Sequence, residues 1–99
     1  MSLAELESTI AAMVQKGRGI LAADESTPTI AKRFAAIGVE STEENRRVWR
    51  SLLAGTEGLG DYISGLILFE ESLGQNSDQQ TTIPEAAWAQ KIVPGIKVD

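Results

Sequence analysis

The sequence predicts an α/β fold with a parallel sheet. Three short apolar runs, at 19–24, 63–69 and 92–98, are separated by segments whose apolar residues recur at helical spacing. Continuous apolar runs of this length are typical of strands covered on both faces, whereas half-exposed strands alternate apolar and polar residues. The order helix, strand, two helices, strand, short helix, strand is typical of parallel α/β proteins.

The composition is that of a single globular domain. The chain has 99 residues, a formal net charge of -5, 42% hydrophobic residues, and no cysteine or histidine. These counts exclude a disulfide scaffold, a thiol nucleophile and a thiolate metal site, so proton chemistry must use Asp, Glu, Lys, Tyr or bound water. The acidic balance argues against nucleic-acid binding, which depends on clustered Lys and Arg.

No targeting or membrane segment is expected. The first six residues lack the basic stretch and long apolar run of a secretory signal. No apolar run approaches the roughly 20 residues that span a bilayer. A cytoplasmic location without membrane partners is therefore the prediction.

An amphipathic helix is expected over residues 1–16. Ser2 and Glu5 have the spacing of a capping box, in which each side chain accepts a hydrogen bond from the other residue's backbone N–H. Apolar residues follow at helical spacing on one face: Leu3, Leu6, Ile10, Met13 and Val14. Gly17 and Gly19 end the helix, and the run 19–24 is the first predicted strand.

Two helices are expected between the first and second strands. Thr27 can cap the first, and Pro28 suits its first position, where a backbone N–H would have no partner. Its buried stripe is predicted to be Ile30, Phe34 and Ile37, with Gly38 at its end. A second capping box, Ser41 to Glu44, opens a helix over 43–54. This helix is predicted to bury Val48, Trp49, Leu52 and Leu53 and to turn Arg46, Arg47 and Arg50 mostly outward.

The remaining elements follow in a simple order. They are a loop at 58–60, a strand at 63–69, a polar loop at 76–82, a short helix at 84–90 and a strand at 92–98. Pro94 and Gly95 interrupt this last strand early.

Charged residues lie at the ends of the three strands: Asp24, the pair Glu70–Glu71, and Lys97. Because ligands bind at the carboxyl ends of parallel strands, these residues are candidates for a functional site. The alternative for each strand is that it simply stops where a polar loop begins. Lys97 lies inside the apolar run, and a lysine in a buried strand needs a partner or a ligand. Glu70 and Glu71 are not expected to act as a pair, because adjacent strand residues point to opposite faces.

The hydroxyl-rich segment 26–29 is a second candidate site. A helix N-terminus presents free backbone N–H groups and a positive dipole end, which suit a phosphate, and Lys32 and Arg33 follow one turn later. The alternative is a helix cap and nothing more. The charges of residues 43–50 are interpreted as a solvated helix face with local ion pairs, and Trp49 and Trp88 as packing residues.

Five segments resemble the amino-terminal part of class I fructose-bisphosphate aldolases. They occur in the family's order and in register, from about Gly17 to the last residue. The segments are Gly19–Thr27, Ile30–Arg33, Thr42–Arg47, Gly65–Glu71 and Gly95–Asp99.

The resemblance implies a partial (β/α)8 TIM barrel, in which residues 1–99 form the amino-terminal portion of one domain. The family cleaves fructose 1,6-bisphosphate to dihydroxyacetone phosphate and glyceraldehyde 3-phosphate in glycolysis and gluconeogenesis. It activates the substrate carbonyl as a Schiff base on a lysine, without a metal or an organic cofactor. The implied partner is a small-molecule sugar phosphate, and full-length members are commonly homo-tetramers.

The resemblance also implies roles for the candidate residues. Asp24 matches the catalytic aspartate that ends the first barrel strand, hydrogen-bonds substrate hydroxyls and lies near the Schiff base. Lys97 matches the lysine that ends the third strand and contacts the substrate and its phosphate. Ser26, Thr29 and Arg33 fall where the family binds sugar phosphate. Family members usually have glycine at the position of Pro28, so weaker phosphate binding is expected.

A (β/α)8 barrel takes roughly 250 residues, so the resemblance covers only its first three strands. The Schiff-base lysine, the acid–base glutamate and further phosphate ligands belong to later strands of the family, and this chain alone is expected to be inactive. Three interpretations stay open: part of an aldolase, a non-catalytic remnant that binds a sugar phosphate or a protein partner, or an unrelated phosphate-binding α/β module. A coding sequence that continues in frame past Asp99 would separate the first two.

Overall fold

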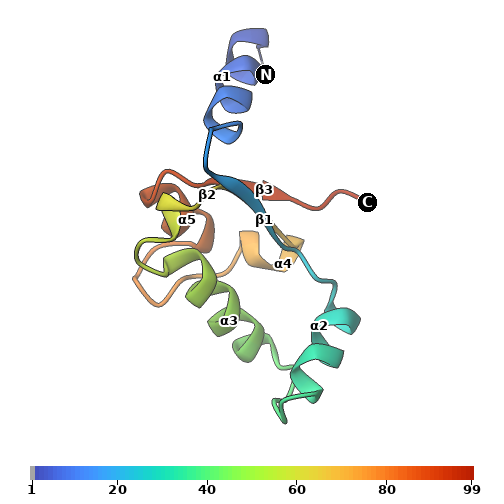
Figure 1. Cartoon of the computed structure of the whole chain (residues 1–99). Coiled ribbons are helices and arrows are strands. Elements are labelled where there is room, and N and C mark those ends of the chain that lie inside the picture. The colour runs from blue at the N-terminus through green and yellow to red at the C-terminus, as the bar shows by residue number, and fades with distance from the viewer. Residues whose placement is uncertain (1) are drawn as a thin grey trace.

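The computed structural model describes residues 2–99 and contains a three-stranded parallel sheet with helices between the strands (Figure 1). In chain order the elements are α1 (Leu3–Met13), β1 (Gly19–Ala23), α2 (Thr27–Ala35), α3 (Glu43–Gly55), the 3-10 turn η1 (Leu59–Asp61), β2 (Ile63–Leu68), α4 (Glu70–Leu73), α5 (Ile83–Ala89) and β3 (Val93–Ile96). The predicted α/β class and parallel strands are confirmed. None of the helices in this part of the chain is both long and apolar enough to cross a membrane.

The register of the sheet brings the three carboxyl ends level with one another. The strand order is β1-β2-β3, and Leu68 at the end of β2 pairs with Ala23 of β1 and with Ile96 of β3. The residues that follow the three strands therefore lie at one edge of the sheet. In a parallel sheet this edge is where ligands bind.

The hydrophobic core lies between one face of the sheet and helices α3 and α5. Its buried members are Ala23, Ala54, Leu66, Leu68, Ile83, Ala86, Ala87 and Ile92. Small residues on both helices, Ala54 on α3 and Ala86 and Ala87 on α5, let the two helices approach closely. Thr82 caps α5 in a complete capping box with Glu85, so this short helix begins at a defined residue.

Burial on β1 and α1 differs from the prediction. Of the five β1 residues only Ala23 is buried, and Ile20 is 50% exposed. The expectation of a strand covered on both faces is wrong here, because β1 is an edge strand and the core covers one side of the sheet. Helix α1 has its predicted Ser2–Glu5 capping box but buries none of its residues, and it extends away from the sheet (Figure 1).

The inward face of α3 also differs from the prediction. Val48, Trp49 and Leu52 are exposed, whereas Arg50, Ser51 and Ala54 are buried. The helix turns its small residues toward α5 because they permit close packing, and this rotation carries Arg50 inward. On α2, Ile30 and Phe34 are buried as predicted, but Ile37 is 73% exposed because it lies beyond the end of the helix.

Helix α2 begins one residue before its predicted start, whereas α3 begins at Glu43 as predicted. Ser26, not Thr27, precedes the first residue of α2, and Pro28 is the second helical residue. Helix α3 is capped by Thr42, whose side chain accepts a hydrogen bond from the Asn45 N–H. The predicted capping box of Ser41 and Glu44 is wrong, because Thr42 and not Ser41 is the residue that caps the helix.

Candidate functional site

Asp24 and Lys97 lie side by side at the carboxyl edge of the sheet. Asp24 follows β1 and Lys97 follows β3, and the Lys97 N–H donates to the Leu68 carbonyl at 3.0 Å. The Lys97 Nζ lies 3.9 Å from Asp24 Oδ2 and 3.5 Å from Asp99 Oδ1. The first distance exceeds a hydrogen bond, so the carboxylate and the ammonium are close enough to attract one another and are still available to a ligand.

Lys97 does not lie inside a buried strand, although the sequence predicts that it does. Strand β3 ends at Ile96, so Lys97 lies just outside the strand rather than within it, and Val98 is 90% exposed. The side chain of Lys97 is 33% exposed and that of Asp24 is 25% exposed. Lys97 has acidic partners, as a half-buried ammonium requires. Both side chains can be reached from solvent.

The start of α2 places the hydroxyl groups beside Asp24 in the chain. The Ser26 hydroxyl donates to Thr29 Oγ1 at 3.1 Å, and no side chain caps the helix N-terminus. Uncapped N–H groups and two hydroxyls at a positive dipole end are suited to an anion. Segment 26–29 therefore does not form the side-chain cap that the alternative interpretation predicts.

Arg33 lies one turn after Thr29 on α2, at a spacing that places both on one face of the helix. Its Nη1 lies 3.4 Å from Glu25 Oε2, and its side chain is 67% exposed. Arg33 is thus held near the loop after β1 by a weak, solvated ion pair. Lys32 is on the same helix but forms no ion pair within residues 2–99.

A cluster of opposite charges lies beneath this edge, and the sequence analysis missed it. The Arg46 guanidinium forms two hydrogen bonds with the Glu71 carboxylate, at 2.8 and 2.9 Å. These bonds raise the pKa of Arg46 and hold the pKa of Glu71 below its ordinary value. Arg50 lies between Glu71 and Glu25, at 3.9 and 3.8 Å from their carboxylate oxygens.

The prediction that Arg46 and Arg50 face solvent is wrong, whereas the local pair of Arg47 with Glu44, at 2.7 Å, is confirmed.

Glu70 and Glu71 were expected at the end of a strand but lie on α4, because β2 ends at Leu68 and Phe69 precedes the helix. On α3 the residues that face inward recur at intervals of four: Arg46, Arg50 and Ala54. In the sequence, the more apolar stripe of Val48, Trp49 and Leu52 is an equally regular candidate for the buried face of this helix.

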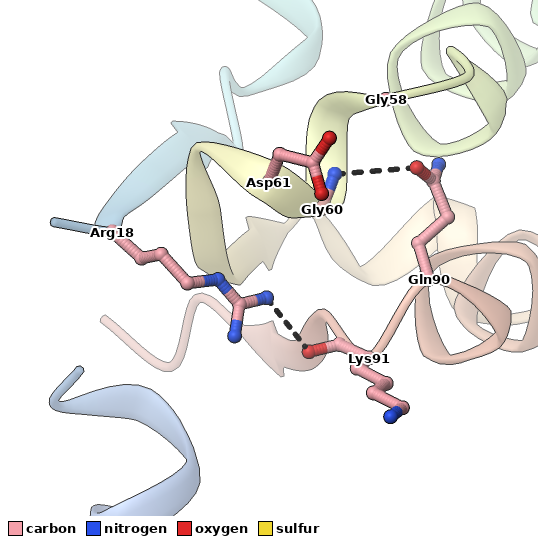
Figure 2. Close-up of a pocket in the computed structure, with 6 residues that line it drawn as sticks. All are labelled: Arg18, Gly58, Gly60, Asp61, Gln90 and Lys91. Carbon is pink, nitrogen blue, oxygen red and sulfur yellow. Dashed lines mark hydrogen bonds between the residues drawn. The ribbon is translucent and has the colours of Figure 1, made fainter. Parts of the chain in front are cut away.

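The opposite edge of the sheet has a different architecture. A pocket of about 460 Å³ is lined there by Arg18, Gly58, Gly60, Asp61, Gln90 and Lys91 (Figure 2). Arg18 donates to the carbonyls of Ile63 and Lys91, at 2.9 and 3.2 Å, and so joins the amino ends of all three strands. Gly60 donates to the Gln90 side chain at 3.2 Å, and a Cβ at this glycine would collide with the Gln90 backbone. The polar groups at this edge hydrogen-bond the segments that precede the strands to one another.

No group of three or more acidic side chains that could hold a metal occurs in residues 2–99. At the carboxyl edge the Asp24 carboxylate lies near the Lys97 ammonium, which also has Asp99 beside it. The two hydroxyls and the Arg33 guanidinium follow on α2, where Glu25 pairs with Arg33. Groups of these types are suited to a polyhydroxylated anion. The ammonium and the guanidinium supply positive charge to phosphate, and the carboxylate accepts hydrogen bonds from hydroxyls.

Comparisons with known proteins give one family. A family model described as "Glycolytic: Fructose-bisphosphate aldolase class-I" matches residues 5–99. The probable class 1 fructose-bisphosphate aldolase of Xanthomonas axonopodis is 54% identical over 99 residues, which are 100% of this chain and 30% of that protein. Fructose-bisphosphate aldolase 1 of Toxoplasma gondii is 58% identical over 95 residues, or 96% of this chain and 26% of that protein.

A solved structure shares the fold of the chain. It is the fructose-bisphosphate aldolase of Plasmodium falciparum in complex with TRAP and a small-molecule inhibitor, with a TM-score of 0.91 and 53% identity. The match covers 97% of this chain and 28% of the other chain. The chain thus spans 25–30% of the length of the curated relatives that it matches.

Proposed function

Because the chain belongs to the class I fructose-bisphosphate aldolase family, we propose that it supplies the first three strands of a (β/α)8 barrel that cleaves fructose 1,6-bisphosphate. The products are dihydroxyacetone phosphate and glyceraldehyde 3-phosphate, in cytoplasmic glycolysis and gluconeogenesis. The observation that carries this proposal is the pairing of Asp24 with Lys97 at the carboxyl edge, directly beside the uncapped start of α2.

In this function the chain contributes charge and orientation. The Lys97 ammonium donates to a substrate oxygen or phosphate, and the Asp24 carboxylate accepts from substrate hydroxyls. Asp24 also stabilises the positive charge of the Schiff base, which forms on a lysine of a later strand. Ser26, Thr29 and Arg33 hold a phosphate at the start of α2, where the missing N–H of Pro28 leaves one donor fewer.

Residues 1–99 by themselves are proposed to be inactive, because the family's Schiff-base lysine lies on a later strand. We expect the whole protein to form a homo-oligomer, because full-length members of the family are commonly tetramers. No metal or organic cofactor is required for Schiff-base chemistry of this kind.

The test is a hybrid enzyme in which residues 1–99 replace the matching segment of the Xanthomonas axonopodis aldolase. The hybrid is expected to release triose phosphates from fructose 1,6-bisphosphate. K97M is expected to lower kcat/KM by roughly ten- to a hundred-fold, the effect of losing one charged hydrogen bond. K91M is the matched control, because Lys91 lies at the opposite edge of the sheet. A folded hybrid without activity, or equal kinetics for the two variants, would contradict the proposal.

A further inference from the structure

We propose that Arg50 is a positioning residue, which holds the peptide between Asp24 and the phosphate-binding residues in a fixed place. The inference rests on the function proposed above and adds a residue to it. Arg50 is fully buried, lies in the middle of α3, and touches none of the groups assigned to the substrate.

The contact that carries the proposal is a hydrogen bond to the backbone. Arg50 Nη2 donates to the Glu25 carbonyl at 2.6 Å. This carbonyl belongs to the peptide that joins Glu25 to Ser26, immediately after Asp24. The guanidinium therefore holds the turn at Glu25. Asp24, whose carboxylate is proposed to contact the substrate hydroxyls, precedes this turn, and Ser26, whose hydroxyl is proposed to bind the phosphate, follows it.

Two carboxylates and an aromatic ring lie around the Arg50 guanidinium. Glu25 Oε1 lies at 3.8 Å, Glu71 Oε1 lies at 3.9 Å, and the centroid of the Phe69 ring lies 5.9 Å from Arg50 Cζ. Glu71 is held in turn by Arg46 from the preceding turn of α3. The turn after β1 is thus connected through Arg50 to the residues that follow β2.

This arrangement is expensive if it serves only stability. Burial lowers the pKa of Arg50, although the nearby carboxylates of Glu25 and Glu71 favour its charge. Its Nε and Nη1 also have no hydrogen-bond partner within residues 2–99. An apolar side chain of similar volume at such a position is often as stabilising as a buried ion pair or more so. A role in placing the Glu25–Ser26 peptide explains why a guanidinium occupies this site.

The hybrid enzyme provides the test. R50K keeps the charge and most of the aliphatic stem but loses the planar fork that reaches a carbonyl and two carboxylates together. We expect kcat/KM for fructose 1,6-bisphosphate to fall about 100-fold, the cost of misplacing a substrate-positioning group by about 1 Å, while the melting temperature stays within a few degrees of the unmodified hybrid. R47K is the matched control, because Arg47 pairs with Glu44 and Asp78 on the outer side of α3, and its kinetics should not change.

A double-mutant cycle distinguishes positioning from general stability. If Arg50 acts through the Ser26 peptide, S26A should cost much less in the R50K background than in the unmodified hybrid. The R47K background should leave the cost of S26A unchanged. Additive effects of R50K and S26A, or a loss of activity in R50K that follows its melting temperature, would overturn the positioning role while leaving the aldolase function intact. An unmodified hybrid that folds but does not cleave the substrate would instead overturn the proposed function, and the inference with it.

Discussion

The carboxylate of Asp24 is the residue-level feature whose chemical role is most directly testable. D24N in the hybrid keeps the shape of the side chain and removes its charge beside the cationic Schiff base of the proposed function. Preorganised electrostatic contacts of this kind contribute roughly 10²–10³-fold in rate, so kcat should fall by that factor with the fold retained. Steady-state kinetics with far-UV circular dichroism measures both quantities. Near-normal turnover in D24N would exclude the role assigned to Asp24.

A second residue-level prediction concerns the pH dependence of stability. The two hydrogen bonds from Arg46 hold the pKa of Glu71 below its ordinary value of 4.5. Since the folded state binds this proton less readily than the unfolded state, the stabilisation is complete above pH 4.5 and is lost as the pH falls through the lowered pKa. In the hybrid, E71Q should therefore be less stable than the unmodified protein at pH 7, and the difference should shrink toward pH 3.

Glu70 provides the control for this prediction. It is the exposed neighbour of Glu71 on α4 and has no ion pair within residues 2–99. Melting temperatures of E70Q should follow those of the unmodified hybrid at every pH. If E70Q and E71Q have the same pH profile, the pair of Arg46 with Glu71 does not stabilise the protein.

Sequence reasoning at this scale found the residues that follow the strands and missed those beneath them. A charged residue at the end of an apolar run is a local signal, and it singles out Asp24, the pair Glu70–Glu71 and Lys97. Arg50 gave no such signal, because its burial depends on the rotation of α3 against α5, which is set by tertiary packing of small residues. Glu71 was misjudged for a related reason: β2 ends at Leu68, three residues before it.

Among the elements, α5 depends most clearly on its cap. The helix spans only seven residues yet carries three buried residues, and Thr82 and Glu85 each accept a hydrogen bond from the other's backbone, at 3.2 and 3.0 Å. Loss of such a cap costs about 1 kcal/mol, so T82A should lower the unfolding free energy of the hybrid by about that amount. S8A is the control, because Ser8 lies on an exposed turn of α1. Equal urea midpoints for both variants would show that the capping box does not stabilise α5.

Sequence patterns predicted the elements better than their buried faces. Caps and glycines are local, so the positions of α1, α2 and α5 were predicted to within a few residues. The face that a helix buries is not local when two stripes compete. On α3 the stripe of small residues faces α5, whereas the larger apolar residues Trp49 and Leu52 are exposed.

At the scale of the whole fold, the sheet formed within residues 2–99 has two unpaired edges, and its β1 strand is largely uncovered. Strands β1 and β3 each pair with β2 on one side only. Large apolar side chains are exposed on α1 and β1, namely Leu3, Leu6, Ile10, Val14 and Ile20. Open edges and contiguous apolar surface favour association. The apolar residues of β1 would be covered on both faces, as the sequence predicts, only if other structure packed against this strand.

From this follows the prediction for residues 1–99 in isolation. The isolated chain should form no covalent adduct with dihydroxyacetone phosphate, because the Schiff-base lysine of the family lies on a later strand. It should also self-associate rather than behave as a well-packed monomer, because its edges and apolar surface are open. Borohydride trapping followed by intact mass tests the chemistry, and size-exclusion chromatography with near-UV circular dichroism tests the packing. An adduct on one specific lysine would overturn the first expectation. A sharp monomer peak with native-like aromatic signals would overturn the second, and would show that three strands of this sheet fold without the rest of a barrel.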